Sequence, residues 1–298
     1  MPNRLKEYFR YLPPGPQERQ WGLYVTGAGY QLTDPEEHYP PPGHPITHNF
    51  SWDRGRVLDQ YGIVYLVQGE GEFDSKQTGL CHLNVGDAII IFPGFWHRYR
   101  PVKKIGWKEY WVLFQGEDAE RMQQRGFITP EKPILRAGLA DTIIDPFLHI
   151  LDGIRAEPVG FQQMIAASTM QIIAATLGAV RKQEMGSHIF EKIKQAKALL
   201  EQDLRELPLM ENIAEELQMS RAQFFRVFRK HTGLTPYQYH LELKLNRARQ
   251  MLCDSEFSVE QIARILGFKN VCHFSKLFKN KVGMAPTPWR MNRHIQDS

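Results

Sequence analysis

The stretch that decides the fold of the C-terminal third reads SVEQIARILGFKNVCHFSKLFKNKVGMAP, residues 258–286. Ser258 and Gln261 have the spacing of a capping box that opens a short helix. Gly267 stands where a turn needs positive φ, and Asn270 can cap the next helix. That helix has apolar residues at the i, i+3, i+4 spacing of a buried face, namely Phe274, Leu277 and Phe278. The pattern predicts a helix-turn-helix unit, whose second helix typically enters the DNA major groove.

The same pattern occurs once more upstream, so the C-terminal region contains an internal repeat. Residues 213–236 match residues 262–286 in two blocks, at offsets of 49 and 50, with one residue inserted between the blocks. Ser220 can cap the second helix of the upstream unit. Gln218 stands where the downstream unit has Gly267, so the upstream turn is less ideal. Agreement over so many positions predicts two helix-turn-helix units.

A long helix is predicted between the two units. Thr235-Pro236 supplies a cap and a proline at the first turn, and the helical pattern runs to about Leu252. About 17 residues give a helix of about 25 Å. A rod of this order can hold two recognition helices in adjacent major grooves, about 34 Å apart. We therefore expect one chain to read two grooves on one face of the duplex.

The region from about Ile189 to Arg293 resembles the DNA-binding domain of the AraC/XylS family of bacterial transcription regulators. The family's closing signature is present as Ile262-Ala263-x-x-x-Gly267-Phe268, then Phe274-Ser275-Lys276-x-Phe278-Lys279 and Gly283-x-x-Pro286. His273 and Trp289 differ from the residues usual in the family, and neither change removes a core function. The resemblance implies an all-α domain that binds double-stranded DNA.

The resemblance also implies which side chains contact DNA, all on the outward face of the second helix of each unit. Base contacts would come from Ala222, Phe225, Arg226, Val271, Cys272, His273 and Lys276. Arg221 and Lys230 share the outward face, and Lys230 is better interpreted as a phosphate contact. Arg226 can pair with guanine in bidentate fashion, which is worth roughly 1–3 kcal/mol of discrimination. Two alternatives stay open: burial of Phe225 against the long helix, and a passive place for Cys272 in the interface.

Charge is distributed unevenly along the chain. Residues 186–298 contain 18 Lys and Arg against 12 Asp and Glu, a net charge of +6, whereas residues 1–185 contain 19 against 21, a net charge of −2. The basic excess lies in the region of the repeat, where a polyanion would bind. Charge of this size is also common in solvated domains, so it supports the DNA-binding prediction without carrying it.

Cysteine use and the N-terminus indicate a cytoplasmic protein. Cys81, Cys253 and Cys272 are widely spaced and form no C-x-x-C, which argues against disulfides and structural zinc. The N-terminal MPNRLKEYFRYLPPGPQERQ lacks the apolar region of a signal peptide. Residues 164–180 are the most apolar long stretch, about 17 residues and marginal for crossing a bilayer. We expect a buried interface helix there and no membrane association.

Short β-type runs occupy the chain from about Ile46 to Gln115. Examples are residues 63–67, 88–92 and 109–114, each bounded by turn signals. Such spacing predicts an antiparallel β-barrel or jelly roll. Residues 1 to about 45 are rich in Pro and Gly and are interpreted as an arm with loops.

From about Leu139 the apolar period becomes helical and predicts two helices, roughly 139–155 and 160–184. Their apolar stripe exceeds what one small barrel needs to cover, so we predict a homodimer through the second helix. The fold class is α+β: an N-terminal antiparallel barrel with dimerisation helices in residues 1–184, a linker at 185–188, and an all-α double helix-turn-helix domain in 189–298.

One segment of the barrel, Gly86-Asp87-x-x-x-x-x-Pro93-x-x-x-His97, resembles the second motif of the cupin superfamily. Metal-binding cupins also need an H-x-H with an upstream carboxylate, and here only His44 and His48 lie upstream, in a Pro-rich loop. His97 alone cannot hold a metal that needs three or more protein ligands. We predict no metal and no cofactor, with a turn-stabilising role for His97 and a cupin-type enzyme as the alternative for this domain.

The region from about Trp21 to Gln115 is similar to the sugar-binding domain of arabinose-type regulators. The resemblance implies a pocket formed by Arg54, Tyr99, Glu109 and Trp111. An indole can stack on a pyranose, and Arg and Glu can bond its hydroxyls, so a monosaccharide is the expected effector. Glu109 replaces an imidazole of the arabinose type, which argues against arabinose itself. The alternatives are a core role for Trp111 and pairing of Arg54 with a nearby Asp.

The sequence thus predicts a DNA-binding transcription regulator whose barrel binds a small polar effector. Effector binding would order the arm or shift the dimer geometry, which requires different affinities for two states. Family resemblance favours an activator that contacts RNA polymerase. No nucleophile–base pair or carboxylate pair at telling spacing supports catalysis, so we expect no enzyme activity. A ligand-independent architectural DNA binder is the other alternative.

Overall fold

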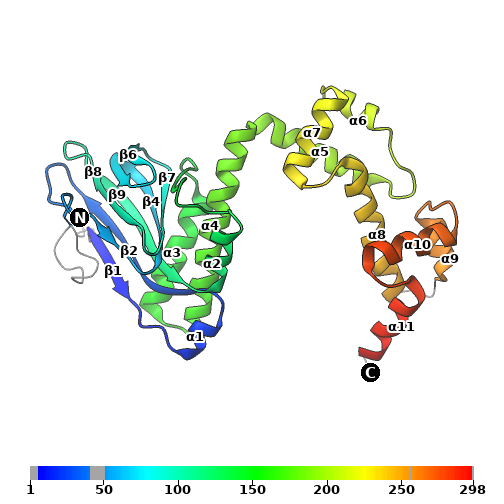
Figure 1. Ribbon diagram of the computed structural model, residues 1–298, viewed down its shortest axis with the longest axis horizontal. Helices are drawn as coiled ribbons and strands as arrows, with labels where there is room; N and C mark the ends of the chain where they lie inside the picture. The colour runs from blue at the N-terminus through cyan, green and yellow to red at the C-terminus, as the bar shows by residue number, and fades with distance from the viewer. Residues whose placement is uncertain (1–5, 41–50, 255–256, 297–298) are drawn as a thin grey trace. The chain divides into compact units, whose positions relative to one another are not determined.

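A computed structural model describes residues 6–40, 51–254 and 257–296 (Figure 1). The chain divides into two units, Met1–Glu184 and Met185–Ser298. Antiparallel strands with covering helices build the first unit, and helices alone build the second among the described residues. This arrangement confirms the predicted α+β class.

Two antiparallel sheets form the framework of the first unit. The larger sheet has the order β1 (Glu7–Tyr11), β2 (Tyr24–Thr33), β9 (Trp107–Gln115), β4 (Tyr61–Gly69), β7 (Asp87–Ile91) and β10 (Ile134–Arg136). The smaller sheet has the order β3 (Arg56–Val57), β8 (Trp96–Pro101), β5 (Gly71–Ser75) and β6 (Gly79–Leu83). Neighbouring strands pair in antiparallel fashion in both sheets. The predicted antiparallel sheet domain is therefore confirmed.

The larger sheet is buried on both faces, because successive side chains of a strand point in opposite directions. On β4, Ile63 and Tyr65 join the core that contains the helix residues. Val64 and Leu66 join the core shared with the smaller sheet. Two-sided burial explains why this strand reads as a continuous apolar run rather than as an alternating one.

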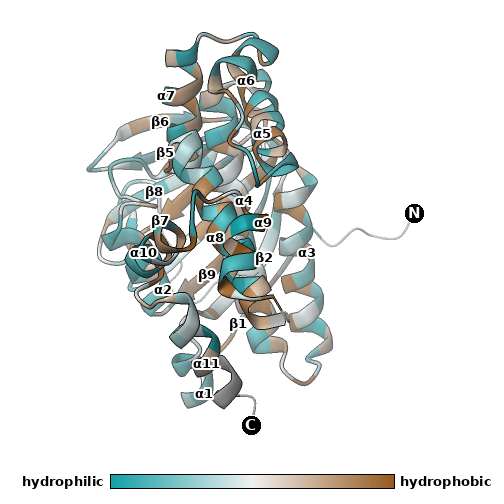
Figure 2. Cartoon of the chain, turned by 90° about the vertical axis from the view of Figure 1, so that its right-hand side faces the viewer, coloured by the Kyte–Doolittle hydropathy of each residue, from teal (hydrophilic) through white to brown (hydrophobic). Residues whose placement is uncertain are grey.

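Helices α3 (Asp141–Ala156) and α4 (Phe161–Met185) cover one face of the larger sheet and lie close to the predicted ranges. Phe147 of α3 stacks on Tyr65 and Tyr110, with ring centroids 6.3 and 5.7 Å apart. Figure 2 shows hydrophobic and hydrophilic bands along α3, as expected for a helix with one buried face. Two shorter helices complete the unit, α1 (Pro16–Gln20) and α2 (Glu117–Gln124).

Helix α4 is long and apolar enough to cross a membrane by length and composition, with a mean hydropathy of 1.4 over 18 residues. A third of that stretch is buried inside the unit. Ile165, Ile172 and Ile173 are almost completely buried in the core shared with the larger sheet. These contacts are those of a core helix with one face left open.

The C-terminal part of the chain, Met185–Ser298, contains the two predicted helix-turn-helix units. The first helix-turn-helix comprises α6 (Met210–Glu216) and α7 (Arg221–Thr232). The second comprises α9 (Val259–Ile265) and α10 (Val271–Val282). The remaining helices are α5 (Ser187–Gln202), α8 (Pro236–Asp254) and α11 (Pro286–Gln296). The capping box of Ser258 and Gln261 and the caps at Ser220 and Asn270 form as predicted.

The junction between α4 and α5 is shorter than the predicted linker at residues 185–188. Helix α4 ends at Met185 and α5 begins at Ser187, so Gly186 alone separates them. Its φ of 78° is incompatible with a continuous right-handed helix. The break between the two helices therefore lies at one residue inside the predicted linker.

Each helix-turn-helix unit has its own hydrophobic core. The first core surrounds Phe224 and Phe228, and the second surrounds Phe274 and Phe278, all four at 0% exposure. No described residue belongs to both buried clusters. The long helix α8 joins the units, contributing Tyr239 to the first core and Leu245 to the second.

Candidate functional site

Helix α7 presents a basic face to solvent. Arg221, Ala222, Arg226 and Lys230 are all exposed, where the outward-face prediction places them. Ser220 begins the helix, since its hydroxyl accepts a backbone hydrogen bond of 3.2 Å. The helix therefore holds this face rigidly against a buried aromatic core and leaves it accessible to a ligand.

Phe225 has a different environment from its neighbours on α7. It is half-buried, and its ring lies edge-on to Tyr237 of α8 with centroids 5.6 Å apart. The Arg221 guanidinium lies 5.4 Å from the centre of the same ring and also pairs with Glu211 at 3.1 Å. The structure thus places Phe225 against the long helix, which is the alternative that the sequence left open.

Helix α10 presents the corresponding face of the second unit. Cys272, His273 and Lys276 are exposed, whereas Val271 is half-buried beside the second core. The Asn270 side chain accepts a hydrogen bond of 2.8 Å from the backbone of His273 and fixes the start of the helix. The residues predicted to contact bases in this unit therefore differ in exposure, and Val271 is the least exposed of them.

Three of the four predicted pocket residues lie between the two sheets of the N-terminal unit. Tyr99, Glu109 and Trp111 are 6%, 3% and 8% exposed. Tyr39 links the first two, because its hydroxyl donates a hydrogen bond of 3.0 Å to Glu109 and its ring lies 6.1 Å from that of Tyr99. Trp111 lies two residues beyond Glu109 on β9 and packs against Tyr11 at 5.8 Å.

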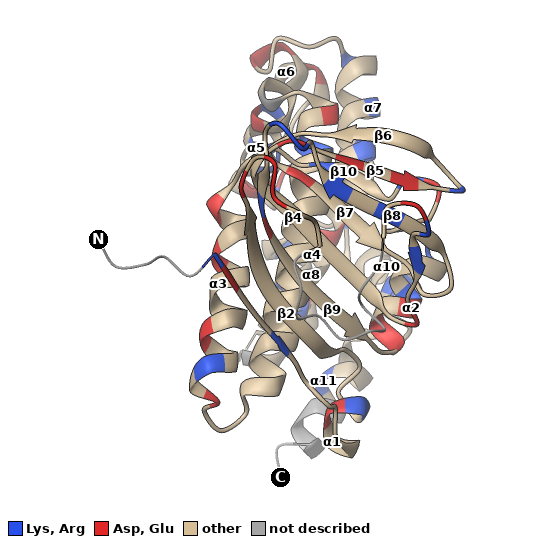
Figure 3. Ribbon diagram, turned by 90° about the vertical axis from the view of Figure 1, so that its left-hand side faces the viewer, with Lys and Arg blue, Asp and Glu red and all other residues tan. Residues whose placement is uncertain are grey.

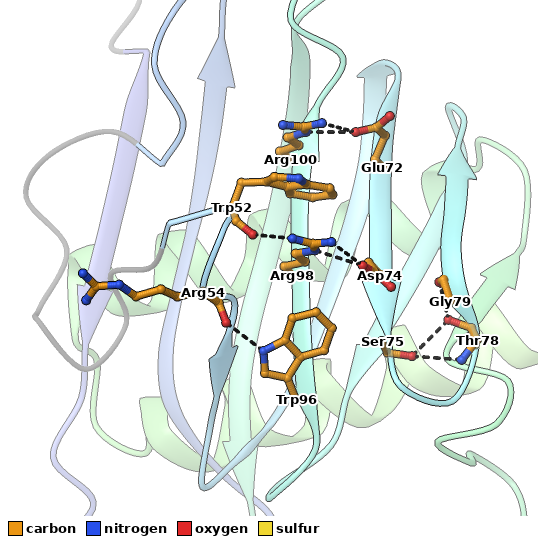
Figure 4. Close-up of polar contacts among 10 residues, drawn as sticks. All are labelled: Trp52, Arg54, Glu72, Asp74, Ser75, Thr78, Gly79, Trp96, Arg98 and Arg100. Atoms are coloured by element: carbon orange, nitrogen blue, oxygen red, sulfur yellow. Dashed lines mark hydrogen bonds and ion pairs between the residues drawn. The ribbon is translucent and has the colours of Figure 1, made fainter.

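The fourth predicted pocket residue, Arg54, does not lie with the other three. Its side chain is exposed and points away from the small sheet, and its carbonyl accepts a hydrogen bond of 2.8 Å from Trp96 Nε1 (Figure 4). Arg56 takes the inward position, because it begins β3 opposite His97 of β8. Its guanidinium donates to the Tyr99 hydroxyl at 2.6 Å. The strand pairing, and not the spacing of arginines in the sequence, decides which one faces inward.

The interior between the two sheets also contains polar residues that the sequence analysis does not name. Trp107 lies edge-on to Tyr39 with centroids 5.3 Å apart, and Thr33 pairs with it across β2 and β9. Both face inward at 1% and 2% exposure. The alternation along β9 carries a signal for Trp107, since it shares the face of Glu109 and Trp111.

Electrostatics single out Glu109. Burial raises the pKa of its carboxyl to about 8, although the hydrogen bond from Tyr39 and the charge of Arg56 oppose this shift. Its Oε2 has no hydrogen-bond partner among the described residues, and neither do Trp107 Nε1 and Thr33 Oγ1. A buried polar group without a partner costs about 1–3 kcal/mol. These three groups together are therefore an unsatisfied set inside an otherwise packed domain.

His97 is fully engaged inside the protein. Its Nδ1–H donates to the carbonyl of Phe95 at 3.1 Å, and its Nε2 then accepts from Arg56 at 3.2 Å. Burial lowers its pKa to about 3, so the ring is neutral at physiological pH. Among the described residues, no three His, Cys, Asp or Glu side chains are grouped to hold a metal. His44 and His48 lie outside the described residues.

The outer face of the smaller sheet carries a ladder of paired charges. Trp52 lies between Arg98 and Arg100, whose guanidinium carbons are 4.3 and 3.8 Å from the centre of its ring. Arg98 pairs with Asp74 and Arg100 with Glu72, each at 2.8 Å (Figure 4). Figure 3 shows the basic residues of β8 beside the acidic residues of β5. These charges pair with one another on the outer face of the smaller sheet.

A double helix-turn-helix domain, joined to a domain of two sheets with a few polar groups buried between them, is typical of a class, the ligand-responsive DNA-binding regulators. Residues 42–207 match the family model of the AraC-like ligand binding domain, and residues 213–292 match a helix-turn-helix domain. Since the first match alone covers more than half of the chain, the protein belongs to the AraC family of transcription regulators. It therefore combines a ligand-binding domain with a DNA-binding domain.

Relatives with curated names match most of the chain. The Msm operon regulatory protein of Streptococcus mutans is 22% identical over 246 residues, covering 81% of this chain and 87% of the relative. The raffinose operon transcriptional regulatory protein RafR of Pediococcus pentosaceus is 24% identical over 250 residues, covering 81% and 88%. The lactose operon transcription activator of Staphylococcus xylosus is 24% identical over 249 residues, covering 80% and 86%. These relatives are transcription regulators and not enzymes.

Solved structures match the C-terminal part. An AraC-type transcriptional regulator from Chromobacterium violaceum is 34% identical, with a TM-score of 0.34, and the match covers 36% of this chain and 96% of that chain. The DNA-binding domain of AdpA, solved with a target DNA, is 27% identical, with a TM-score of 0.31, and the match covers 36% and 94%.

Proposed function

We propose that the protein is a transcription activator whose N-terminal domain binds a neutral sugar, most simply a monosaccharide. The observation that carries the proposal is the set of unpartnered buried groups, Glu109 Oε2, Trp107 Nε1 and Thr33 Oγ1. A polyhydroxylated ligand can satisfy all three, because each hydroxyl both donates and accepts hydrogen bonds.

The three groups lie close enough to serve one ligand. Thr33 is the direct cross-strand partner of Trp107, and Gln31 is that of Glu109, two residues along the same strands. Side chains two residues apart share a face of a strand, and directly paired side chains lie about 5 Å apart. An acceptor, an indole donor and a hydroxyl therefore line one small area of wall.

The surrounding aromatic rings suit the apolar faces of a sugar ring. Tyr39, Tyr99 and Trp107 contact one another in this interior, and Tyr11 contacts Trp111. At neutral pH the raised pKa leaves Glu109 largely protonated, so its carboxyl can donate one hydrogen bond and accept another. Arg56, rather than Arg54, would supply the cationic donor of the pocket.

The names of the relatives support the same class of effector. Two of them regulate raffinose and lactose operons, and the second is called an activator. On this ground we extend a sugar effector and activation, with contact to RNA polymerase, to the present chain. The expected cytoplasmic location follows from the same role.

We further propose that α7 and α10 read DNA in two adjacent major grooves. Arg226 is exposed and forms no ion pair with another described residue, so it is the best candidate for pairing with a guanine. Cys272, His273 and Lys276 would contact bases in the second groove, with Ala222 and Val271 touching thymine methyl groups. Lys230 and Arg221 would contact phosphates or hold the helix in register, and Phe225 would contact a base only with its exposed edge.

The open face of α4 supports a homodimer. Exposed positions recur at alternating spacings of three and four residues, namely Met164, Ala167, Gln171, Ala174 and Gly178. This spacing is that of a coiled-coil seam, and its small residues, Ala167, Ala174 and Gly178, would let a second helix approach closely. We propose that residues 1–184 form the effector-binding and dimerisation domain and residues 189–298 the DNA-binding domain.

Calorimetric titration with a panel of pentoses, hexoses and disaccharides tests the effector. We expect one sugar to bind with a Kd below the millimolar range, and Glu109→Gln to weaken it at least about tenfold. Glu72→Gln, on the outer face of the smaller sheet, is the matched control and should leave binding unchanged. Failure of every sugar to bind would contradict the sugar class and favour a ligand-independent DNA binder.

A further inference from the structure

The two helix-turn-helix units have separate cores, so their relative position depends on a few bridging contacts. Helix α8 is one bridge. The other is the loop of residues 203–209 between α5 and α6, which belongs to the first unit and extends toward α9 (Figure 1). Asp203 shapes this loop, because its carboxylate accepts backbone hydrogen bonds from Arg205 at 2.7 Å and Glu206 at 3.4 Å.

A buried lysine of α8 contacts both units at once. Lys244 is 9% exposed and lies near the middle of the helix. Its Nζ donates a hydrogen bond of 3.1 Å to the carbonyl of Arg205, in the loop of the first unit. The same ammonium lies 5.5 Å from the ring centre of Phe268, in the turn of the second unit. Lys244 therefore lies where α8, the loop of residues 203–209 and the turn of the second helix-turn-helix unit meet.

The turn of the second unit also packs directly on this loop. A Cβ built on Gly267 would overlap the carbonyl oxygen of Arg205. Gly267 has φ 67°, and its counterpart in the first unit, Gln218, has φ 51°. Gln218 shows that a residue with a side chain can adopt the left-handed conformation of this turn. Position 267 requires glycine for another reason: the backbone of Arg205 leaves no room for a Cβ atom there.

We propose that Lys244 is a positioning residue that holds the two helix-turn-helix units at one separation and so fixes the spacing of the DNA boxes that one chain reads. The inference rests on the proposed two-groove reading. Adding one base pair between the boxes moves the second box by about 3.4 Å and rotates it by about 35°. A rigid pair of units cannot follow both changes, whereas a pair joined by α8 alone can bend.

Binding of the full-length protein to DNA with two selected boxes tests the proposal. The separation is set at the selected value and at one base pair more or less, and each box is also tested alone. Lys244→Met removes the ammonium and keeps the length and helix propensity of the side chain. Lys192→Met is the matched control, since Lys192 Nζ donates to the carbonyl of Gln218 at 3.3 Å within the first unit.

We expect wild type and Lys192→Met to lose about tenfold or more in affinity at the altered separations. Lys244→Met should lose less than about threefold, with its affinity for each single box within about twofold of wild type. A merely structural role would weaken single-box binding and leave the spacing preference intact. That result, or an unchanged spacing preference, overturns the proposal and leaves the two-groove reading standing. A wild type indifferent to spacing overturns both.

A second pair of variants keeps the test decisive if Lys244→Met fails to fold. Gly267→Ala and Gln218→Ala both place alanine in a left-handed turn, at positions that correspond in the two units. Only Gly267→Ala displaces the loop at Arg205. We expect the spacing preference to weaken in Gly267→Ala and to persist in Gln218→Ala. Equal spacing preferences in the two variants would overturn the proposal.

Discussion

Tyr39 donates a hydrogen bond of 3.0 Å to one carboxyl oxygen of Glu109, and the other oxygen has no partner among the described residues. The pair joins a loop after β2 to the centre of β9 and lies among the aromatic rings of the pocket. It leaves one oxygen of a buried carboxyl without a partner, which is the group that the proposed hydroxylated ligand would satisfy.

Glu109 should make stability depend on pH. Its folded pKa of about 8 lies above the ordinary value of 4.5, so between these values the folded state holds a proton that the unfolded state has released. The contribution of Glu109 to the free energy of unfolding is therefore fully present below about pH 4.5. It is lost as the pH rises toward 8, by at most about 1.4 kcal/mol per pH unit. Urea unfolding at several pH values measures this slope.

Glu109→Gln is the comparison for that slope. The variant lacks the titrating carboxyl, so its free energy of unfolding should fall less than that of wild type between pH 5 and 8. The contribution of His97, whose lowered pKa acts in the opposite direction, is common to both proteins and cancels in the difference. Identical slopes would show that Glu109 titrates normally.

Substitutions of Arg54 and Arg56 should differ in their effect on the affinity for the effector. Arg56→Met removes the guanidinium that donates hydrogen bonds to Tyr99 and His97. The affinity for the sugar should fall by about tenfold or more, since hydrogen bonds of charged groups contribute roughly 1.5–3 kcal/mol. Arg54→Met changes an exposed side chain and should stay within about twofold of wild type. Calorimetry of the two variants decides the point. Equal losses would return Arg54 to the pocket.

Arg226 and Lys230 should differ in what they do on DNA. Arg226→Ala should cost about 1–3 kcal/mol on the selected site and relax the preference at one base pair. Lys230→Ala should weaken binding to all sequences alike and reduce the salt dependence by about one unit of slope. Binding to a set of single-base variants over a range of salt concentrations measures both. A uniform loss in Arg226→Ala would make it a phosphate contact.

The open face of α4 should hold two chains together. Ala174→Arg places a charge in the middle of the seam and should shift the protein from dimer to monomer in sedimentation velocity at micromolar concentration. His149→Arg, at an exposed position of the neighbouring helix α3, is the control and should remain dimeric. A dimeric Ala174→Arg protein would exclude this face as the interface.

The helix-turn-helix units could be predicted in detail because their signals are local. Ser258 and Gln261 cap the helix that they begin, and Asn270 caps the next one, all within the same few residues. Helix ends of this kind depend on short-range hydrogen bonds, which a sequence displays directly. The same local logic placed the helices α3 and α4 within a few residues of their observed ends.

The pocket could be predicted only in part, because its residues come together through strand pairing. Glu109 and Trp111 share a face of a long strand, and alternation is enough to place them. Arg56 lies on a strand of two residues, whose orientation depends on β8 and not on its own pattern. Tyr39 comes from a loop, and nothing local indicates that it meets Glu109. Long-range packing decides both.

The most direct test of the account is the affinity of the full-length protein for its selected DNA site with and without sugar, at one fixed salt concentration. The account predicts that one sugar changes the affinity of wild type by about tenfold or more and leaves that of Glu109→Gln nearly unchanged. A DNA affinity that no sugar alters would contradict it, and the pocket would then have no part in controlling the DNA-binding domain.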